Sequence, residues 1–173
     1  DENGDEIKGN NIEGRLCIKF PWPSMARTIY NDHERFKSVY FSAFNNKYFT
    51  GDGCIRDENG MYKITGRVDD VLIVSGHNLG TAEIESAIDK HQNVCETAIV
   101  GYSHDIKGNG IYAYVICHEE PKDKIKLREE INDIVVKEVG SIAKVDKIQF
   151  VKDLPKTRSG KIMRRILRKI ADN

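Results

Sequence analysis

The chain has 173 residues, of which 39% are hydrophobic and 31% are charged, and 27 Lys and Arg balance 27 Asp and Glu to a formal net charge of +0. This composition is typical of one small folded domain, or of one with part of a second attached, and it excludes wholesale disorder. The balanced charge also excludes a global field that would attract nucleic acid or anionic lipid, so any basic patch must be local.

The cysteines, Cys17, Cys54, Cys95 and Cys117, are widely separated and show no paired spacing, which argues against a zinc site or a disulfide framework. We therefore expect a reducing intracellular compartment, first the cytoplasm, with a nuclear or organellar pool as the alternative. No apolar run approaches the roughly 18 residues of a membrane span, so no membrane contact is expected. The start DENGDE lacks an initiating Met and the features of a signal peptide, which suggests a fragment or a processed chain.

The segment before Gly66 predicts strands linked by turns. Asn59-Gly60 between two short apolar runs is a hairpin signal, because both residues tolerate the positive φ of a tight turn. We expect a strand at 15–20, a helix at 28–37, a strand at 48–53 that runs into a turn, and a hairpin of strands at 54–57 and 61–66.

Asp52 has two interpretations, both based on its place in Gly51-Asp52-Gly53. The first is turn chemistry, because Asp bonds its own backbone and glycine accepts positive φ. The second is a binding role, because a carboxylate fixed at a strand end can accept hydrogen bonds from both vicinal hydroxyls of a ribose. Spacing alone favours the turn.

The stretch GRVDDVLIVSGHNLG at 66–80 separates two kinds of pattern. Val71–Val74 is short, aliphatic and largely β-branched, which predicts a buried strand, and Ser75-Gly76 predicts the turn that ends it. Asp69 and Asp70 precede the strand as a charged, solvated spot. This spot is either a surface turn, which spacing favours, or a hinge between two packed bodies.

Helices and strands alternate after this stretch, which predicts an α+β domain with a small antiparallel or mixed sheet and helices packed on it. Thr81 is expected to cap the first helix, with acidic residues in its first turn. The expected elements are a helix at 81–91, strands at 97–102 and 111–117 joined by a tight turn at 107–110, a helix through Leu127 and Val139 that Gly140 ends, and a strand at 147–151.

The C-terminal sequence LPKTRSGKIMRRILRKI predicts an irregular segment followed by an amphipathic helix. Its basic face has three interpretations: a solvated surface, a contact with nucleic acid or membrane, or an anion site where Ser159-Gly160-Lys161 starts the helix. The apolar face comprises Ile162, Met163, Ile166, Leu167 and Ile170. The basic face comprises Lys161, Arg164, Arg165, Arg168 and Lys169.

Four segments carry a resemblance to a known family. They are WPSMARTIYNDHERF at 22–36, YFTGDG at 48–53, GRVDDVLIVSGHNLGTAEIESA at 66–87 and PKTRSGKIMRRILRKIA at 155–171. Together they resemble the C-terminal part of the AMP-forming acetyl-CoA synthetases, within the adenylate-forming superfamily of acyl-CoA synthetases and luciferases. The first segment is particular to acetyl- and propionyl-type enzymes, and the resemblance runs from about Ile12 to the end.

The resemblance implies a ligase with two steps. Acetate and ATP, with Mg²⁺, give acetyl-adenylate and diphosphate, and the thiol of coenzyme A then displaces AMP. It also implies that residues 1–68 end a large N-terminal domain, that residues 69–173 form a mobile domain, and that the missing N-terminal domain is a partner in the same chain. The fragment alone is therefore expected to be inactive or nearly so.

The resemblance also implies roles for individual residues. Lys161 resembles the lysine of the adenylation step, and its acetylation and deacetylation by dedicated enzymes are implied as an off-switch. Asp69 resembles the hinge residue, which reverses the preference for a surface turn. The remaining matches are Asp52 and Arg67 for the nucleotide, Ser75 and Gly76 for the pantetheine tunnel of coenzyme A, and Asp89, His91 and Val94 for a bound cation, two of them through backbone carbonyls.

Two positions depart from the family pattern. Asn78 stands where an arginine usually reaches the nucleotide phosphate, and Val136 stands where an arginine near the coenzyme A phosphate is common. An amide keeps a hydrogen bond but loses the charge, so either neighbours such as Lys137 supply these contacts or phosphate affinity is weaker. The alternatives to an acetate enzyme are a synthetase for propionate or another short-chain acid, and a non-enzymatic module that binds nucleic acid or a partner through its basic helix.

Overall fold

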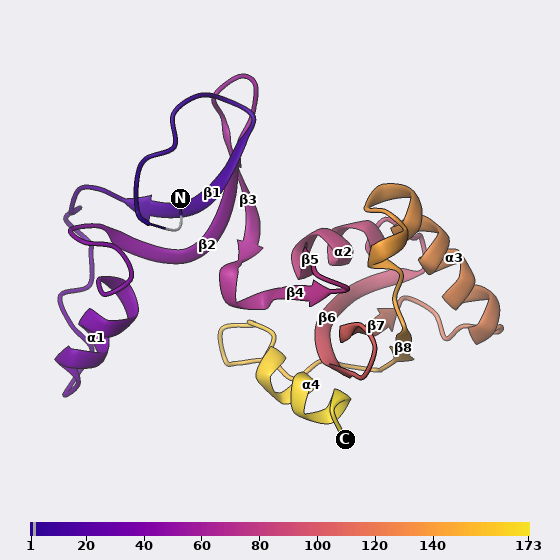
Figure 1. The fold of residues 1–173 in the computed structure, drawn as a ribbon. Coiled ribbons are helices and arrows are strands. Elements are labelled where there is room, and N and C mark those ends of the chain that lie inside the picture. Colours follow the sequence, from indigo (N-terminus) through magenta and orange to yellow (C-terminus); the bar gives the residue numbers. More distant parts are fainter. Residues whose placement is uncertain (2) are drawn as a thin grey trace. The chain divides into compact units, whose positions relative to one another are not determined.

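The computed structural model describes residue 1 and residues 3–173, which form two compact units, Asp1–Asp69 and Asp70–Asn173 (Figure 1). In these residues the first unit contains a three-stranded sheet and one α-helix, and the second a five-stranded sheet and three α-helices. The predicted α+β class is therefore confirmed. That the second unit is a mobile domain and the first the end of a larger one stays a prediction.

The first unit is an antiparallel sheet closed by the predicted hairpin. Asp57 holds the hairpin turn, because its carboxylate accepts hydrogen bonds from the backbone N–H groups of Asn59 and Met61 at 2.9 and 2.8 Å. Gly60 supplies the positive φ of +81° that the turn needs. The strands are β1 (Ile12–Ile18), β2 (Tyr48–Arg56) and β3 (Tyr62–Arg67), in the order β1-β2-β3.

Strand β2 continues through Gly51-Asp52-Gly53, so the turn predicted there is wrong. Gly51 has a φ of +81°, and the register between β2 and β3 shifts between Gly53 and Cys54. Glycines inside a strand commonly mark such an irregularity rather than a chain reversal, because they allow the strand to bend without losing its partner. Asp52 therefore lies within the strand.

The single α-helix of the first unit, α1 (His33–Tyr40), begins later than the predicted Thr28. Asp32 caps it, because its carboxylate accepts a hydrogen bond from the Arg35 N–H at 3.1 Å. An Asp cap satisfies an N–H that has no partner within the helix, and this fixes where the helix starts. Phe36 is buried and anchors the helix.

The second unit is a mixed sheet whose predicted strands all occur. Val71–Val74 is confirmed as a strand, and the two-residue turn that follows it pairs Val74 with His77. Strand β8 runs parallel to β7, and all other pairs in this sheet are antiparallel. The strands are β4 (Val71–Val74), β5 (His77–Gly80), β6 (Val94–His104), β7 (Gly108–Cys117) and β8 (Lys147–Phe150), in the order β5-β4-β7-β6 with β8 beside β7.

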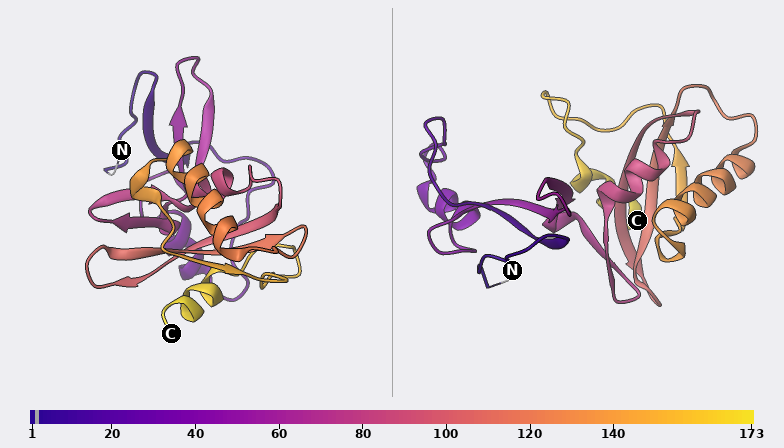
Figure 2. Two further views of the ribbon diagram at one scale, coloured as in Figure 1. Left: turned by 90° about the vertical axis from the view of Figure 1, so that its right-hand side faces the viewer. Right: turned by 90° about the horizontal axis from the view of Figure 1, so that it is seen from above.

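The helices cover both faces of this sheet (Figure 2). Successive side chains of a strand point to opposite faces, so β6 contributes Ile99 to one layer, and Ala98 and Val100 to the other. On the first face lie α2 (Thr81–Ile88) and α3 (Lys124–Glu138), and on the second lies α4 (Arg164–Ala171). Leu167 and Ala171 are the buried residues of α4.

Three boundaries in this unit differ from the prediction. Helix α2 ends at Ile88 rather than at residue 91. Its N-cap is Gly80 and not the predicted Thr81, which is the first residue of the helix and is buried. Strand β6 extends to His104 and β7 begins at Gly108, so the turn lies at 105–107 rather than at the predicted 107–110. Helix α3 ends as predicted, with Gly140 at a φ of +124°. None of the helices in the described part of the chain has the length and apolarity of a membrane span.

Candidate functional site

Asp52 and Arg67 face each other across β2 and β3, where they are direct partners in the register. The Arg67 Nη1 atom lies 3.6 Å from the Asp52 Oδ1 atom, and the Asp52 side chain is 27% exposed. A paired but accessible carboxylate can still accept hydrogen bonds from a ligand, because each of its oxygens has two lone pairs. The structure thus brings together two residues for which the resemblance implied a nucleotide role.

Gly51 makes room for the arginine of this pair. Arg67 donates from Nη1 to the carbonyl oxygen of Thr50 at 2.8 Å, which places its guanidinium over the neighbouring Gly51. A Cβ atom at Gly51 would lie 2.4 Å from Nη1 and 2.6 Å from Cζ of Arg67. The glycine is therefore needed both for its positive φ and for the close approach of the arginine.

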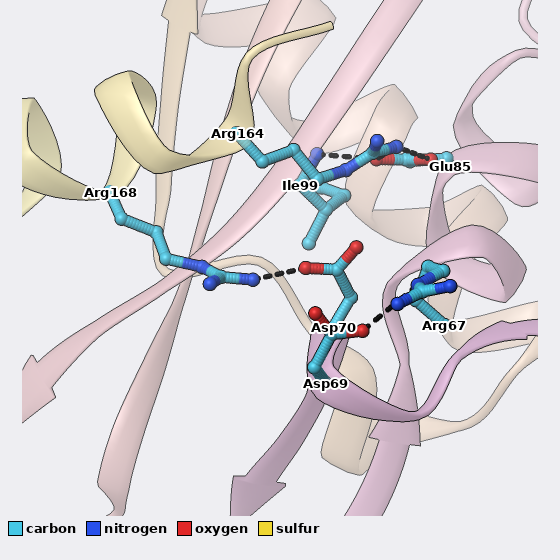
Figure 3. A network of polar contacts seen from close by, with 7 residues as sticks. All are labelled: Arg67, Asp69, Asp70, Glu85, Ile99, Arg164 and Arg168. Atoms are coloured by element: carbon cyan, nitrogen blue, oxygen red, sulfur yellow. Dashed lines mark hydrogen bonds and ion pairs between the residues drawn. The ribbon is translucent and has the colours of Figure 1, made fainter. Parts of the chain in front are cut away.

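Asp69 and Asp70, adjacent in sequence, pair with different arginines, each within its own unit (Figure 3). Asp69 accepts a hydrogen bond from Arg67 Nε at 3.0 Å, and its side chain is 71% exposed. Asp70 pairs with Arg168 of α4 and is 16% exposed. The division between the units falls at the peptide bond between these two residues. The hinge role that the resemblance implied for Asp69 stays a prediction.

The hairpin of β4 and β5 turns at Ser75 and Gly76. Their φ values are +50° and +81°, and a two-residue turn with positive φ at both positions matches the twist of the flanking strands. Apart from its two chain neighbours, no described residue has a heavy atom within 4 Å of the position that a Cβ atom at Gly76 would take, so the tip of the hairpin is open. Asn78 follows on β5 opposite Ile73, and its side chain is exposed.

Lys161 lies in an irregular loop and not at the start of a helix, so that prediction is wrong. Helix α4 begins only at Arg164, and the backbone N–H of Lys161 donates to Thr157 Oγ1 at 3.1 Å. The Gly160 N–H donates to the Thr157 carbonyl at 2.9 Å, so neither N–H is free for an anion. The Lys161 side chain is exposed, and the described residues give it no ion pair.

The basic face of α4 is not simply solvated, because two of its arginines pair with carboxylates of the same unit. Arg164 pairs with Glu85 of α2, with Nη2 lying 2.8 and 2.7 Å from the two carboxylate oxygens (Figure 3). The Glu85 Oε1 atom also accepts from the Ile99 N–H at 2.8 Å, and burial raises the pKa of its carboxyl, with Arg164 opposing that rise. The one available signal was the spacing of Arg164 and Arg168, which places both on one face of a helix.

The implied cation site lies where α2 ends. Both ring nitrogens of His91 have partners, since Nδ1 accepts from the Asn93 N–H at 3.1 Å and Nε2 lies 3.3 Å from a Glu130 oxygen. The His91 carbonyl accepts from the Val94 N–H at 2.9 Å. Asp89 is the C-cap of α2. Among the described residues no group of three or more His, Cys, Asp or Glu side chains is arranged to hold a metal ion, so ligands here would have to include backbone carbonyls.

The chain is similar to a known domain family, to curated proteins and to solved structures. Residues 83–161 match the family model described as the AMP-binding enzyme C-terminal domain. This stretch of the chain is similar to such a domain. The match begins within α2, takes in β6, β7, α3 and β8, and ends at Lys161.

Curated relatives match the chain over its whole length. It is 59% identical over 173 residues to the acetyl-coenzyme A synthetase of Bartonella henselae, covering 100% of this chain and 26% of that protein. It is 58% identical to the acetyl-coenzyme A synthetase of Halorhodospira halophila, covering 27% of that protein. The chain therefore spans about a quarter of the length of these relatives, and the matched part is their C-terminal part.

Solved structures share the fold. The anthranilate CoA ligase AuaEII, in complex with anthranoyl-AMP, matches 95% of this chain and 31% of its own, with a TM-score of 0.82 and 27% identity. The amide bond synthetase McbA from Marinactinospora thermotolerans matches 97% of this chain and 32% of its own, with a TM-score of 0.81 and 22% identity. The second likeness, at this identity, supports the α+β fold alone.

Proposed function

We propose that this chain is the C-terminal part of an ATP-dependent acetate–CoA ligase. The complete enzyme would convert acetate, ATP and CoA to acetyl-CoA, AMP and diphosphate through acetyl-adenylate. The observation that carries the proposal is the 59% identity to an acetyl-coenzyme A synthetase over every residue of the chain. The geometry of Asp52, the Ser75–Gly76 hairpin and Lys161 is compatible with the roles that the reaction requires.

Lys161 is proposed as the catalytic residue of the first step. The acetate carboxylate attacks the α-phosphate of ATP, a bond to the phosphorus forms, and the bond to diphosphate breaks. Both reactants are anions and charge grows on the phosphoryl oxygens, so a positioned ammonium stabilises the transition state. The exposed Lys161 side chain, which the described residues leave without an ion pair, suits this task because its charge is free for the substrate.

The nucleotide is proposed to bind at the β2–β3 pair. The accessible Asp52 carboxylate would accept hydrogen bonds from the ribose hydroxyls, and Arg67 holds that carboxylate in place at 3.6 Å. Asn78 would supply a neutral hydrogen bond to the nucleotide phosphate, at the position where the resemblance implies an arginine.

The second step is proposed to use the hairpin. The CoA thiol loses its proton to solvent and attacks the acetyl carbonyl, the carbon–sulfur bond of the thioester forms, and the bond from the acetyl carbon to the AMP oxygen breaks, so that AMP leaves with the electron pair. The open space at Gly76 suits a narrow pantetheine arm, and Val136 on α3 would lie near the CoA phosphate with Lys137 as the nearby cation. Asp69 is proposed as the hinge that exchanges the two steps.

Further partners belong to the same proposal. Mg²⁺ would enter with ATP and neutralise phosphate charge, and the remaining N-terminal domain of the full enzyme would complete the nucleotide and acetate pockets. A cation at Asp89, His91 and Val94 would be held mainly by backbone carbonyls. An acetyltransferase acting on the exposed Lys161 would remove its charge and stop the first step, and a deacetylase would restore it. Because ATP and CoA occur inside cells, we propose an intracellular, cytoplasmic location.

The test uses the full-length enzyme with acetate, propionate and butyrate as alternative substrates. We expect CoA-dependent AMP formation with the highest kcat/KM for acetate. A preference for propionate or butyrate would assign the enzyme to another short-chain acid. Absence of AMP formation with all three, together with salt-dependent binding to nucleic acid, would favour the binding module instead. The pairing of Arg164 and Arg168 with carboxylates of their own unit already weakens that alternative.

A further inference from the structure

Residues 155–163, which we name the lysine loop, form a closed structure around Lys161. The Met163 N–H donates to the Pro155 carbonyl at 2.8 Å, and Lys156 forms an isolated β-bridge with Ile162. Inside this base, Thr157 bonds the backbone of Lys161 in both directions, at 2.9 and 3.1 Å. The loop is therefore ordered within itself, and its attachment to the domain decides where Lys161 points.

Two ion pairs attach the two ends of the lysine loop to the rest of its unit, one through β6 and the other through α2. At its start, Lys156 Nζ lies 2.6 Å from Glu96 Oε2, and Glu96 is a residue of β6. Just past its end, Arg164 binds both oxygens of Glu85 at 2.7 and 2.8 Å (Figure 3). The two carboxylates hold the loop from both sides of Lys161.

Strand β6 is an edge strand of its sheet, and Glu85 lies against that edge. Its Oε1 atom accepts from the Ile99 N–H at 2.8 Å, which satisfies a backbone donor that no neighbouring strand can reach. Helix α2 comes from one face of the sheet and α4 from the other, so this carboxylate connects two layers at the edge. The Glu85 and Arg164 side chains are only 13% and 23% exposed.

An ion pair with this degree of burial is a weak source of stability, because desolvation of the two charges offsets most of their attraction. The Nε atom of Arg164 is itself buried and has no hydrogen-bond partner among the described residues. The pair does fix geometry, since both oxygens of Glu85 are engaged and neither side chain can rotate without losing contacts. Such a fully engaged ion pair is suited to fixing the position of the segments that carry its two side chains.

We propose that Glu85 and Glu96 are positioning residues for the adenylation step, acting through Arg164 and Lys156 on the two ends of the lysine loop. This inference rests on the proposed function, in which Lys161 acts on the α-phosphate. A displacement of a catalytic group by about 1 Å can cost on the order of a hundredfold in rate. Loss of either ion pair would release one end of the lysine loop and so shift the Lys161 ammonium without changing its charge.

The experiment measures both half-reactions of the full-length enzyme in Glu85→Gln and Glu96→Gln. Acetate-dependent exchange of diphosphate into ATP reports the first step, and acetyl-CoA formation from supplied acetyl-adenylate reports the second. Gln keeps the size of Glu and an acceptor for the Ile99 N–H, but it removes the charge that holds Arg164. We expect kcat of the exchange to fall about tenfold or more, with the KM for ATP and the second step within about twofold of wild type.

Arg165→Gln is the matched control, because Arg165 is exposed on α4 next to Arg164 and has no ion pair within the described residues. It should match wild type in both steps. Arg164→Lys keeps a cation for Glu85 and should retain more exchange activity than Arg164→Gln, which a loss of packing alone would not produce. Glu96→Gln alters a side chain that is 32% exposed, so it decides the matter even where Glu85→Gln does not fold.

Two results would overturn the positioning role. One is a folded Glu96→Gln or Glu85→Gln enzyme with wild-type exchange, and the other is an equal loss in both half-reactions. Lys161→Ala, measured beside them, separates this from the proposed function. If Lys161→Ala retains exchange, the assignment of Lys161 fails; if it loses exchange while the Glu variants do not, only the positioning role fails.

Discussion

Tyr114→Phe tests how α4 is held on the sheet. Tyr114 is 2% exposed in β7, and its hydroxyl donates to the Leu167 carbonyl of α4 at 3.1 Å. Loss of one such hydrogen bond typically costs about 1 kcal/mol, so at neutral pH the variant should unfold more easily by that amount. The same buried hydroxyl makes the effect depend on pH.

Burial raises the pKa of Tyr114 from 10.0 to about 12. The folded state therefore keeps its proton at a pH where the unfolded chain has lost it, and the stability contributed by Tyr114 is present below pH 10 and lost as the pH approaches 12. Two pKa units correspond to about 2.7 kcal/mol. Because this exceeds the hydrogen-bond term, the wild type should become less stable than Tyr114→Phe above roughly pH 11.

Urea unfolding followed by far-ultraviolet circular dichroism measures the difference, because α2, α3 and α4 all lie in unit Asp70–Asn173. Comparing the two proteins at each pH cancels the titration of groups that they share. A difference in unfolding free energy that stays constant from neutral to strongly alkaline pH would refute the described burial of Tyr114 against α4.

Other expectations follow from single contacts. In Gly51→Ala the new Cβ would strike the Arg67 guanidinium. We expect the first unit to lose about 1–3 kcal/mol in urea unfolding, and the full enzyme to bind ATP more weakly in a titration. Asp123→Ala should cost about 1 kcal/mol in urea unfolding, since Asp123 caps α3 at two N–H groups, and an unchanged midpoint would contradict the cap. Asn78→Arg and Val136→Arg should tighten ATP and CoA binding respectively; unchanged affinities in titration would mean that other residues meet these phosphates.

Local patterns allowed the strands and turns of this chain to be predicted from its sequence. Val71–Val74 is a strand at the predicted residues, because a short β-branched run between a charged turn and Ser75-Gly76 favours an extended backbone. The predicted burial is wrong for half of it, since Val71 and Ile73 lie on the exposed face of β4 and only Leu72 and Val74 are buried. Gly140 ends α3 as predicted. The glycines around Asp52 misled, since a glycine in a strand and a glycine in a turn look alike until the partner strand is known.

Only part of the candidate site could be predicted from the sequence. The sequence and its resemblance singled out Lys161, but Arg164 appeared as one of several solvated cations. Its partner Glu85 lies 79 residues away, and no periodicity reports a contact over that distance. The predicted helix start at Lys161 failed for a local reason: the side chain of Thr157 and the carbonyl of Pro155 accept hydrogen bonds from the N–H groups that a helix start would leave free.

The central claim is that Lys161 supplies the charge for adenylation and for nothing else. The most direct measurement compares the two half-reactions in full-length Lys161→Ala. We predict a loss of acetate-dependent diphosphate exchange of a hundredfold or more, about the cost of one preorganised donor or above, with acetyl-CoA formation from supplied acetyl-adenylate near the wild-type rate. Equal losses in both half-reactions, or exchange at the wild-type rate, would contradict the account.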